Sequence, residues 1–125
     1  MDSFKEKAKR YFITGNFSER LGAFDVASTN YFKSLSAIND FILSNINLFP
    51  KDHNERFSLL KENFPRMYRL TSSLFLTYRK TYSKDISKEE MLMLKQRLKE
   101  AFKDAGIEFP TDSEIEVSIQ KAHKK

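Results

Sequence analysis

Apolar residues recur along this chain at spacings of three and four positions, which is the pattern of amphipathic helices. The longest run is expected between about residues 21 and 46, with apolar positions at Phe24, Ala27, Tyr31, Leu35, Ile38, Ile42 and Ile46. No segment alternates with a period of two, and only 3 glycines and 3 prolines are present to build turns. The pattern therefore predicts an all-α fold, an up-and-down bundle of four to five helices with short connections.

Start and stop signals set the expected boundaries of these helices. Ser3 and Glu6 have the spacing of a capping box, so a first helix is expected there, and Gly15 is expected to end it. Ser87 and Glu90 repeat the capping-box spacing and are expected to open the fifth helix. The remaining helices are expected at about residues 21–46, 52–62 and 66–83, with a short final helix from Thr111.

The length of 125 residues suits a single core. We expect a helical bundle over residues 1–106, followed by a short C-terminal helix and a basic tail over residues 107–125. The chain contains no cysteine, which excludes disulfides and thiolate chemistry. No metal-binding or phosphate-loop motif is present either, so no metal or cofactor is expected. Without a signal-peptide pattern or a membrane-length apolar run, we expect a cytoplasmic protein with no membrane partner.

The net charge of +5 arises from 22 basic and 17 acidic residues. Three of the positive charges belong to the tail residues Lys121, Lys124 and Lys125, so the excess over the rest of the chain is small. Such an excess is compatible with attraction to phosphate groups, and equally with a protein that is merely soluble. Charge alone therefore leaves both interpretations open.

The stretch from Leu74 to Tyr82 is the first candidate site, because it places an arginine within an apolar helical run. Arg79 lies one turn from Phe75 and one turn from Tyr82, and burying a guanidinium is costly unless it is paired or stacked. Arg79, Lys80 and Tyr82 are therefore candidate residues for binding a nucleic acid or a phosphate. The alternative is that Arg79 only borders the core and reaches solvent.

The same helix carries a second aromatic stripe. Tyr68, Phe75 and Tyr82 are spaced seven positions apart and lie beside a core line that is already complete. A helix that is apolar on so much of its surface is either central in a bundle or shared with a second subunit. We therefore expect a homodimer with these three residues at its interface, the alternative being that they belong to the core.

A second candidate site lies on the polar side of the second helix. Lys33 and Asp40 project from one face about two turns apart, roughly 10 Å at the rise of an α-helix. They either face solvent or line a cleft that holds a cation and a carboxylate. His53 is the candidate third member of such a cleft and the one possible catalytic base, although its place in a first helical turn favours a surface residue.

Four segments of the chain together resemble the HEPN superfamily, and in particular its small stand-alone archaeal and bacterial members. The segments are Lys7–Phe12, Asp25–Lys33, Asp52–Phe57 and Tyr78–Tyr82, and the similarity extends over about residues 3 to 103. The resemblance implies a four- or five-helix bundle that is usually a homodimer. It also implies RNA cleavage or RNA processing, often in a toxin–antitoxin pair with a minimal nucleotidyltransferase partner.

The catalytic pattern of that family is an arginine, then four to six residues, then a histidine, on a late helix. Arg79 matches the arginine, but the next histidine in this chain is His123. The resemblance therefore implies a non-catalytic or weakly catalytic module associated with RNA or a nucleotide. The alternatives are a divergent metal-independent RNase that uses Arg79 and Tyr82, with His53 supplied from elsewhere in the bundle, and a pure protein-interaction subunit.

Overall fold

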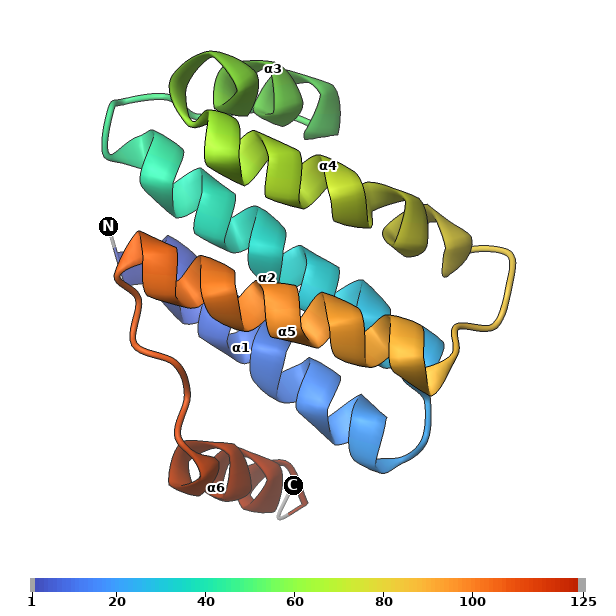
Figure 1. The fold of residues 1–125 in the computed structure, drawn as a ribbon. Helices are drawn as coiled ribbons and strands as arrows, with labels where there is room; N and C mark the ends of the chain where they lie inside the picture. The colour runs from blue at the N-terminus through green and yellow to red at the C-terminus, as the bar shows by residue number, and fades with distance from the viewer. Residues whose placement is uncertain (1, 124–125) are drawn as a thin grey trace.

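The computed structural model describes residues 2–123, and the backbone of this part of the chain is helical with no strand. Its helices are α1 (Asp2–Arg20), α2 (Phe24–Ser44), α3 (His53–Asn63), α4 (Pro65–Lys80), α5 (Lys88–Ala105) and α6 (Asp112–His123) (Figure 1). The prediction of an all-α helical bundle is confirmed. Within residues 2–123 the structure contains no helix that is both long and apolar enough to span a bilayer.

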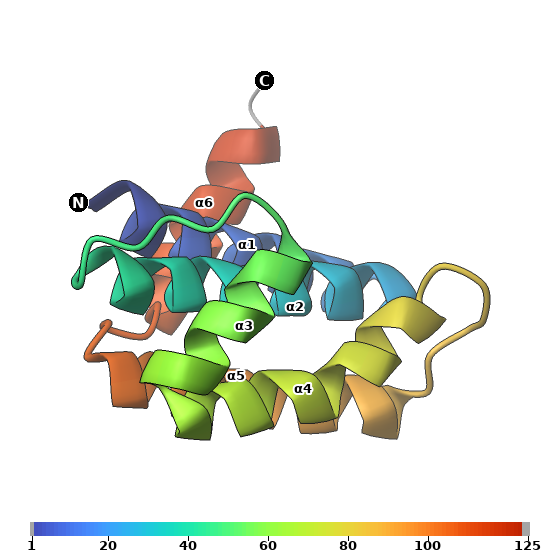
Figure 2. The ribbon, with the colours of Figure 1, turned by 90° about the horizontal axis from the view of Figure 1, so that it is seen from above.

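Helix α2 lies at the centre of the bundle. It contacts α1, α3, α4 and α5, and its residues Tyr31, Leu35 and Ile38 are fully buried. Figure 2 shows α1 and α2 in one layer and α4 and α5 in a second layer, with α3 running from the first layer to the second. Because α3 joins the layers, its first turn lies beside α2 and α4 at the same time.

The expected end of the first helix at Gly15 is wrong, because α1 continues to Arg20. Gly15 is needed for packing instead: a Cβ atom at this position would lie 2.5 Å from Cε1 of Tyr31, closer than real Cβ contacts. The glycine therefore lets α1 approach α2 closely around the Tyr31 ring. The turn between the two helices falls at Gly22, whose φ of 78° is the left-handed conformation that glycine adopts readily.

The capping signals have mixed outcomes. The Ser87 and Glu90 capping box is confirmed, since Glu90 N–H donates to Ser87 Oγ at 3.1 Å and Ser87 N–H donates to Glu90 Oε1 at 3.2 Å. The capping role expected for Ser3 is wrong, because α1 already includes Asp2. A cap also precedes α3, where the Asp52 carboxylate accepts from Glu55 N–H at 2.9 Å.

The C-terminal helix α6 packs on the bundle through α1. Ile107 in the preceding connection and Ile115 in α6 are buried in the same core cluster as the residues of the bundle. The last two lysines of the basic tail expected from the sequence, Lys124 and Lys125, lie outside the described residues.

Candidate functional site

The first candidate site lies at the C-terminal end of α4, where its three residues have separate environments. Arg79 is exposed, and its guanidinium forms no ion pair or hydrogen bond with another described side chain. Lys80 Nζ pairs with Glu90 Oε2 at 2.8 Å. The Tyr82 side chain is 73% exposed, and its hydroxyl lies 2.6 Å from that of Tyr78. The structure does not gather these residues into one cleft.

The aromatic stripe expected at a dimer interface is divided between the interior and the surface. The Phe75 ring packs against Phe32 and Phe57, with ring centroids 5.8 and 5.1 Å away, and Tyr68 packs edge-on against Phe57. Two residues of the stripe are thus covered within one chain, by α2 and α3. The homodimer stays a prediction, and Tyr82, which follows α4, is the one residue of the stripe that is exposed.

The second candidate site is a cleft of about 360 Å³ that lies where α1, α2, α3 and α4 meet. Its lining consists of Lys7, Tyr11, Phe32, Lys33, Ser36, Ala37, Asp40, Lys51, Asp52, His53, Arg56 and Tyr78. The structure therefore brings Lys33, Asp40 and His53 together from α2 and α3. Arg79 is absent from this lining, although its chain neighbour Tyr78 belongs to it.

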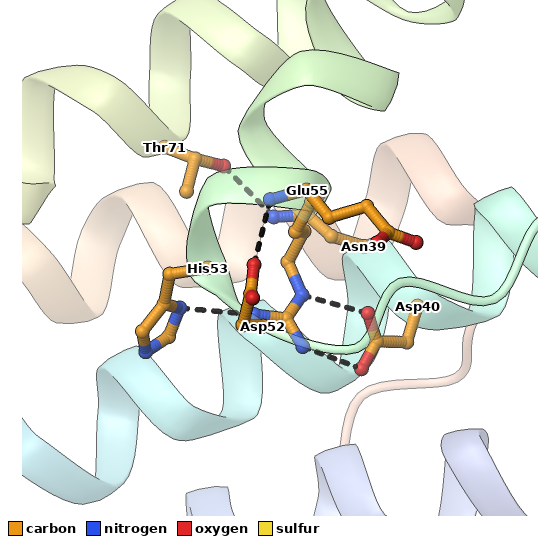
Figure 3. A network of polar contacts seen from close by, with 7 residues as sticks. Asn39, Asp40, Asp52, His53, Glu55 and Thr71 are labelled. Carbon is orange, nitrogen blue, oxygen red and sulfur yellow. Dashed lines mark hydrogen bonds and ion pairs between the residues drawn. The ribbon is translucent and has the colours of Figure 1, made fainter.

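A polar network fixes one wall of the cleft (Figure 3). Arg56 donates from Nε to Asp40 Oδ1 at 2.7 Å and from Nη2 to Oδ2 at 3.1 Å, a two-pronged ion pair between α3 and α2. Its third nitrogen, Nη1, lies 2.9 Å from Nδ1 of His53. The guanidinium thus holds a carboxylate and an imidazole at once.

Local sequence explains how α3 presents this network. Asp52 caps the helix, so α3 begins at His53, and Arg56 follows three positions later. Residues three apart lie on the same face of a helix, which brings the imidazole and the guanidinium together. Sequence reasoning did not single out Arg56. The sequence pattern that could have identified Arg56 is a helix cap, a histidine and an arginine at the spacing found in Asp52-His53-Asn54-Glu55-Arg56.

His53 is half-buried among aromatic rings, so the expectation of a surface residue is wrong. Its ring meets those of Phe32, Phe75 and Tyr78 edge-on, with centroids 6.3, 5.8 and 5.9 Å away. Burial lowers the pKa of His53, and the positive charge of Arg56 lowers this pKa further, while Asp40 and Asp52 oppose the shift. Burial and Arg56 therefore both favour the neutral imidazole.

Buried polar groups also connect α2 with α4. The Asn39 amide donates from Nδ2 to Thr71 Oγ1 at 2.9 Å, and both side chains are buried. Ser36, which lines the cleft, has a buried hydroxyl oxygen without a hydrogen-bond partner among residues 2–123. The lining of the cleft thus includes one buried polar atom without a partner in this part of the chain.

Cations outnumber available anions around the cleft. Lys7, Lys33 and Lys51 form no ion pair with any described residue, whereas the Asp40 carboxylate is held by Arg56 and Asp52 caps α3. The Lys33 ammonium lies 5.9 Å from the centroid of the Tyr11 ring. The lining carries more cations than carboxylates, so the field in the cleft attracts anions.

Metal ligands are not grouped in this way. In the part of the chain that the structure describes, no three histidine, aspartate or glutamate side chains lie close enough together to hold a metal ion.

Comparison with known proteins adds no relative: no family model matches the chain, and neither a curated protein nor a solved structure matches it significantly.

Proposed function

We propose that this chain is a HEPN-like module that binds RNA or a nucleotide through a phosphate group in the cleft, and that it cleaves RNA slowly or not at all. The observation that carries this proposal is the presence of three lysines without ion-pair partners around two carboxylates that are already engaged. A phosphate oxygen is a partner that such ammonium groups can bind.

The size and the lining of the cleft favour a small ligand or one nucleotide of a longer strand. Its volume of about 360 Å³ falls in the range of small-molecule sites, which extends from roughly 300 to 1,000 Å³. The half-buried Tyr11 and the buried Phe32 and Tyr78 provide aromatic surface beside the lysines. Aromatic rings next to cations are the combination that binds single-stranded nucleic acids, because bases stack on rings while cations hold the backbone.

Slow or absent cleavage follows from the proton chemistry of the lining. Metal-independent RNA cleavage needs a group that accepts a proton and a group that donates one near neutral pH. Burial, together with the neighbouring Tyr82 hydroxyl, raises the pKa of Tyr78 to about 12, and the Asp40 carboxylate is occupied by Arg56. His53 is then the one group in the lining whose ordinary pKa lies near neutrality.

A divergent RNase is the second candidate function, and one observation favours it. His53 packs against Tyr78, the residue before Arg79, so an imidazole from α3 lies near the helix that carries the HEPN-like arginine. In this alternative Arg79 holds the RNA backbone and His53 moves the proton. With either function, we also propose a homodimer and a nucleotidyltransferase partner of toxin–antitoxin type. If no ligand binds, the chain is proposed instead to be a pure protein-interaction subunit.

Binding of a fluorescent single-stranded RNA and of AMP tests the main proposal. Lys33→Gln should weaken binding by roughly fivefold, about 1 kcal/mol for a lost charged hydrogen bond, and should lower the salt dependence by about one counterion. The matched control is Lys103→Gln on the exposed side of α5, which should bind as the wild type does. Equal losses in both variants would remove the cleft from the proposal, and no binding by the wild type would reject it.

Cleavage of the same RNA is measured in parallel without metal, with Arg79→Ala as a further variant. We expect no appreciable cleavage by any variant, and weaker RNA binding by Arg79→Ala if the exposed arginine holds the strand outside the cleft. Robust cleavage by the wild type that Arg79→Ala abolishes would instead establish the divergent RNase. Unchanged binding by Arg79→Ala would leave that arginine without a role in the site.

A further inference from the structure

The contact between Arg56 and His53 determines which imidazole nitrogen carries the proton. Arg56 Nη1 lies 2.9 Å from His53 Nδ1. A guanidinium has donors only and stays protonated in proteins, so Nδ1 must accept this hydrogen bond. A neutral imidazole that accepts at Nδ1 carries its proton on Nε2. His53 is therefore in the Nε2–H form.

The surroundings of the two side chains hold this form in place. Arg56 cannot turn away from His53 without loss, because its two other nitrogens donate to both oxygens of Asp40. The imidazole is enclosed by the rings of Phe32, Phe75 and Tyr78, which limit its rotation. The ion pair between α2 and α3 and the ring contacts from α2 and α4 thus fix the same orientation.

The protonated nitrogen has no partner among residues 2–123, and its residue lines the cleft. Figure 3 shows the second ring nitrogen of His53 turned away from the network of Asp40 and Asp52. No hydrogen bond joins Nε2 to another residue in the described range 2–123, and His53 belongs to the lining of the cleft. A half-buried donor without an acceptor is unfavourable, so a ligand that supplies an acceptor gains affinity.

We propose that His53 is the specificity-determining residue of the cleft: it donates its Nε2–H to an unprotonated oxygen of the bound phosphate, and Arg56 is the positioning residue that fixes its tautomer. The ligand in this inference rests on the proposed function, whereas the tautomer does not. A nitrogen that already carries a proton cannot accept one, so His53 in this form does not act as a general base from Nε2. The shared chemistry is a phosphate oxygen, supplied by a free nucleotide or by an RNA strand.

Two amide substitutions separate the roles of the two ring nitrogens. In His53→Gln the amide nitrogen reaches the position of Nε2 and can replace the donor. In His53→Asn the shorter amide reaches the position of Nδ1, keeps a partner for Arg56 and leaves the cleft without the donor. We expect His53→Gln to bind AMP and single-stranded RNA within about twofold of the wild type, and His53→Asn to lose about fivefold or more. Loss for AMP alone or for RNA alone identifies the natural source of the phosphate.

The tautomer is measured directly, without any ligand, by nitrogen-15 NMR of the imidazole. The chain has 2 histidines, so a His123→Gln variant leaves the signals of His53 alone. We expect Nε2 to give the shift of a protonated nitrogen and Nδ1 that of an unprotonated one. Arg56→Gln should produce a mixture of tautomers. A double variant, Asp40→Asn with Arg56→Gln, serves if the single variant fails to fold, because it leaves no unpaired charge.

The outcomes distinguish the two proposals. A proton on Nδ1 in the wild type would overturn the inference whether or not a ligand binds. Equal binding losses in His53→Gln and His53→Asn would also overturn it, because the donor at Nε2 would then be irrelevant. Absence of AMP and RNA binding by the wild type, together with the Nε2–H tautomer, would overturn the proposed function and the role of His53 in recognition, while the tautomer itself would stand.

Discussion

Two polar clusters of this molecule are built from the same kinds of group and have almost the same burial. In one, the Glu19 carboxylate accepts from Tyr31 Oη at 2.7 Å and from Lys95 Nζ at 3.0 Å. In the other, Asp40 is held by Arg56. The charged side chains are 22% and 17% exposed in the first pair and 17% and 13% in the second. Burial therefore does not separate a structural cluster from a candidate site.

What differs is the set of neighbours. The Lys95 ammonium lies over the rings of Phe12 and Tyr31, about 6 Å from each centroid, so its charge is enclosed by Glu19 and aromatic faces. Around Asp40 and Arg56 the neighbours are an open cleft and lysines without ion-pair partners. The first cluster is complete within one chain, whereas the second leaves positive charge for a ligand. The neighbours of the two clusters, rather than their burial, are thus what distinguishes them.

The largest effect should come from disturbing the closed packing beside Glu19. Gly15→Ala places a methyl group against the fully buried Tyr31 ring and should destabilise the protein by about 2 kcal/mol, a typical cost of overpacking. Urea denaturation measures this change. The control is Gly22→Ala, which has open space and costs about 1 kcal/mol through its left-handed backbone alone. A smaller loss for Gly15→Ala than for Gly22→Ala would contradict the tight fit of α1 on α2.

The two clusters should also respond to acid in different pH ranges. Burial alone would raise the pKa of Glu19, but hydrogen bonds from Tyr31 and Lys95 and the charge of Lys95 together lower it. The pKa of His53 is lowered as well, chiefly by burial. A group whose folded-state pKa is lowered stabilises the fold above its unfolded pKa, and this stability is lost as the pH falls. The loss therefore begins below about pH 6.5 for His53 and below about pH 4.5 for Glu19.

Urea denaturation at pH 7, 5.5 and 4 separates these two contributions. His53→Gln should remove the decrease in stability between pH 7 and 5.5, and Glu19→Gln should reduce the decrease between pH 5.5 and 4. His123→Gln is the matched control for loss of a histidine. If the decrease between pH 7 and 5.5 persists in His53→Gln, the imidazole is not the group that couples folding to pH in this range.

The smallest effect is expected at the cleft itself. Ser36→Ala removes a buried hydroxyl that has no hydrogen-bond partner among the described residues, so stability should be unchanged or rise by up to about 1 kcal/mol. Ser34→Ala, on the same helix, is the control: its hydroxyl donates to the Ala8 carbonyl oxygen at 2.6 Å, and its loss should cost about 1 kcal/mol. Thermal unfolding compares the two. Equal losses would mean that Ser36 makes a contact comparable to that of Ser34.

The helices could be predicted from the sequence because their signals are local. Apolar spacing and the pairing of Ser87 with Glu90 depend on residues within one or two turns, and these predictions hold. The helix end predicted at Gly15 was wrong because the role of this glycine depends on a ring from the next helix. The role of Arg56 could not be predicted for the same reason: Arg79 and Arg56 both lie near aromatic residues in the sequence, and only tertiary packing decides which one meets a carboxylate.

The pairing of Tyr78 with Tyr82 gives the molecule a built-in optical reporter. The chain has 5 tyrosines and no tryptophan, so its near-ultraviolet absorption and its emission come from phenolic rings without interference from indole. Tyr78 lines the cleft and stacks on Phe32 at 4.4 Å between ring centroids, while its hydroxyl meets that of the exposed Tyr82. The spectrum of Tyr78 therefore responds to changes inside the cleft, and that of the hydrogen-bonded Tyr82 responds to the solvent.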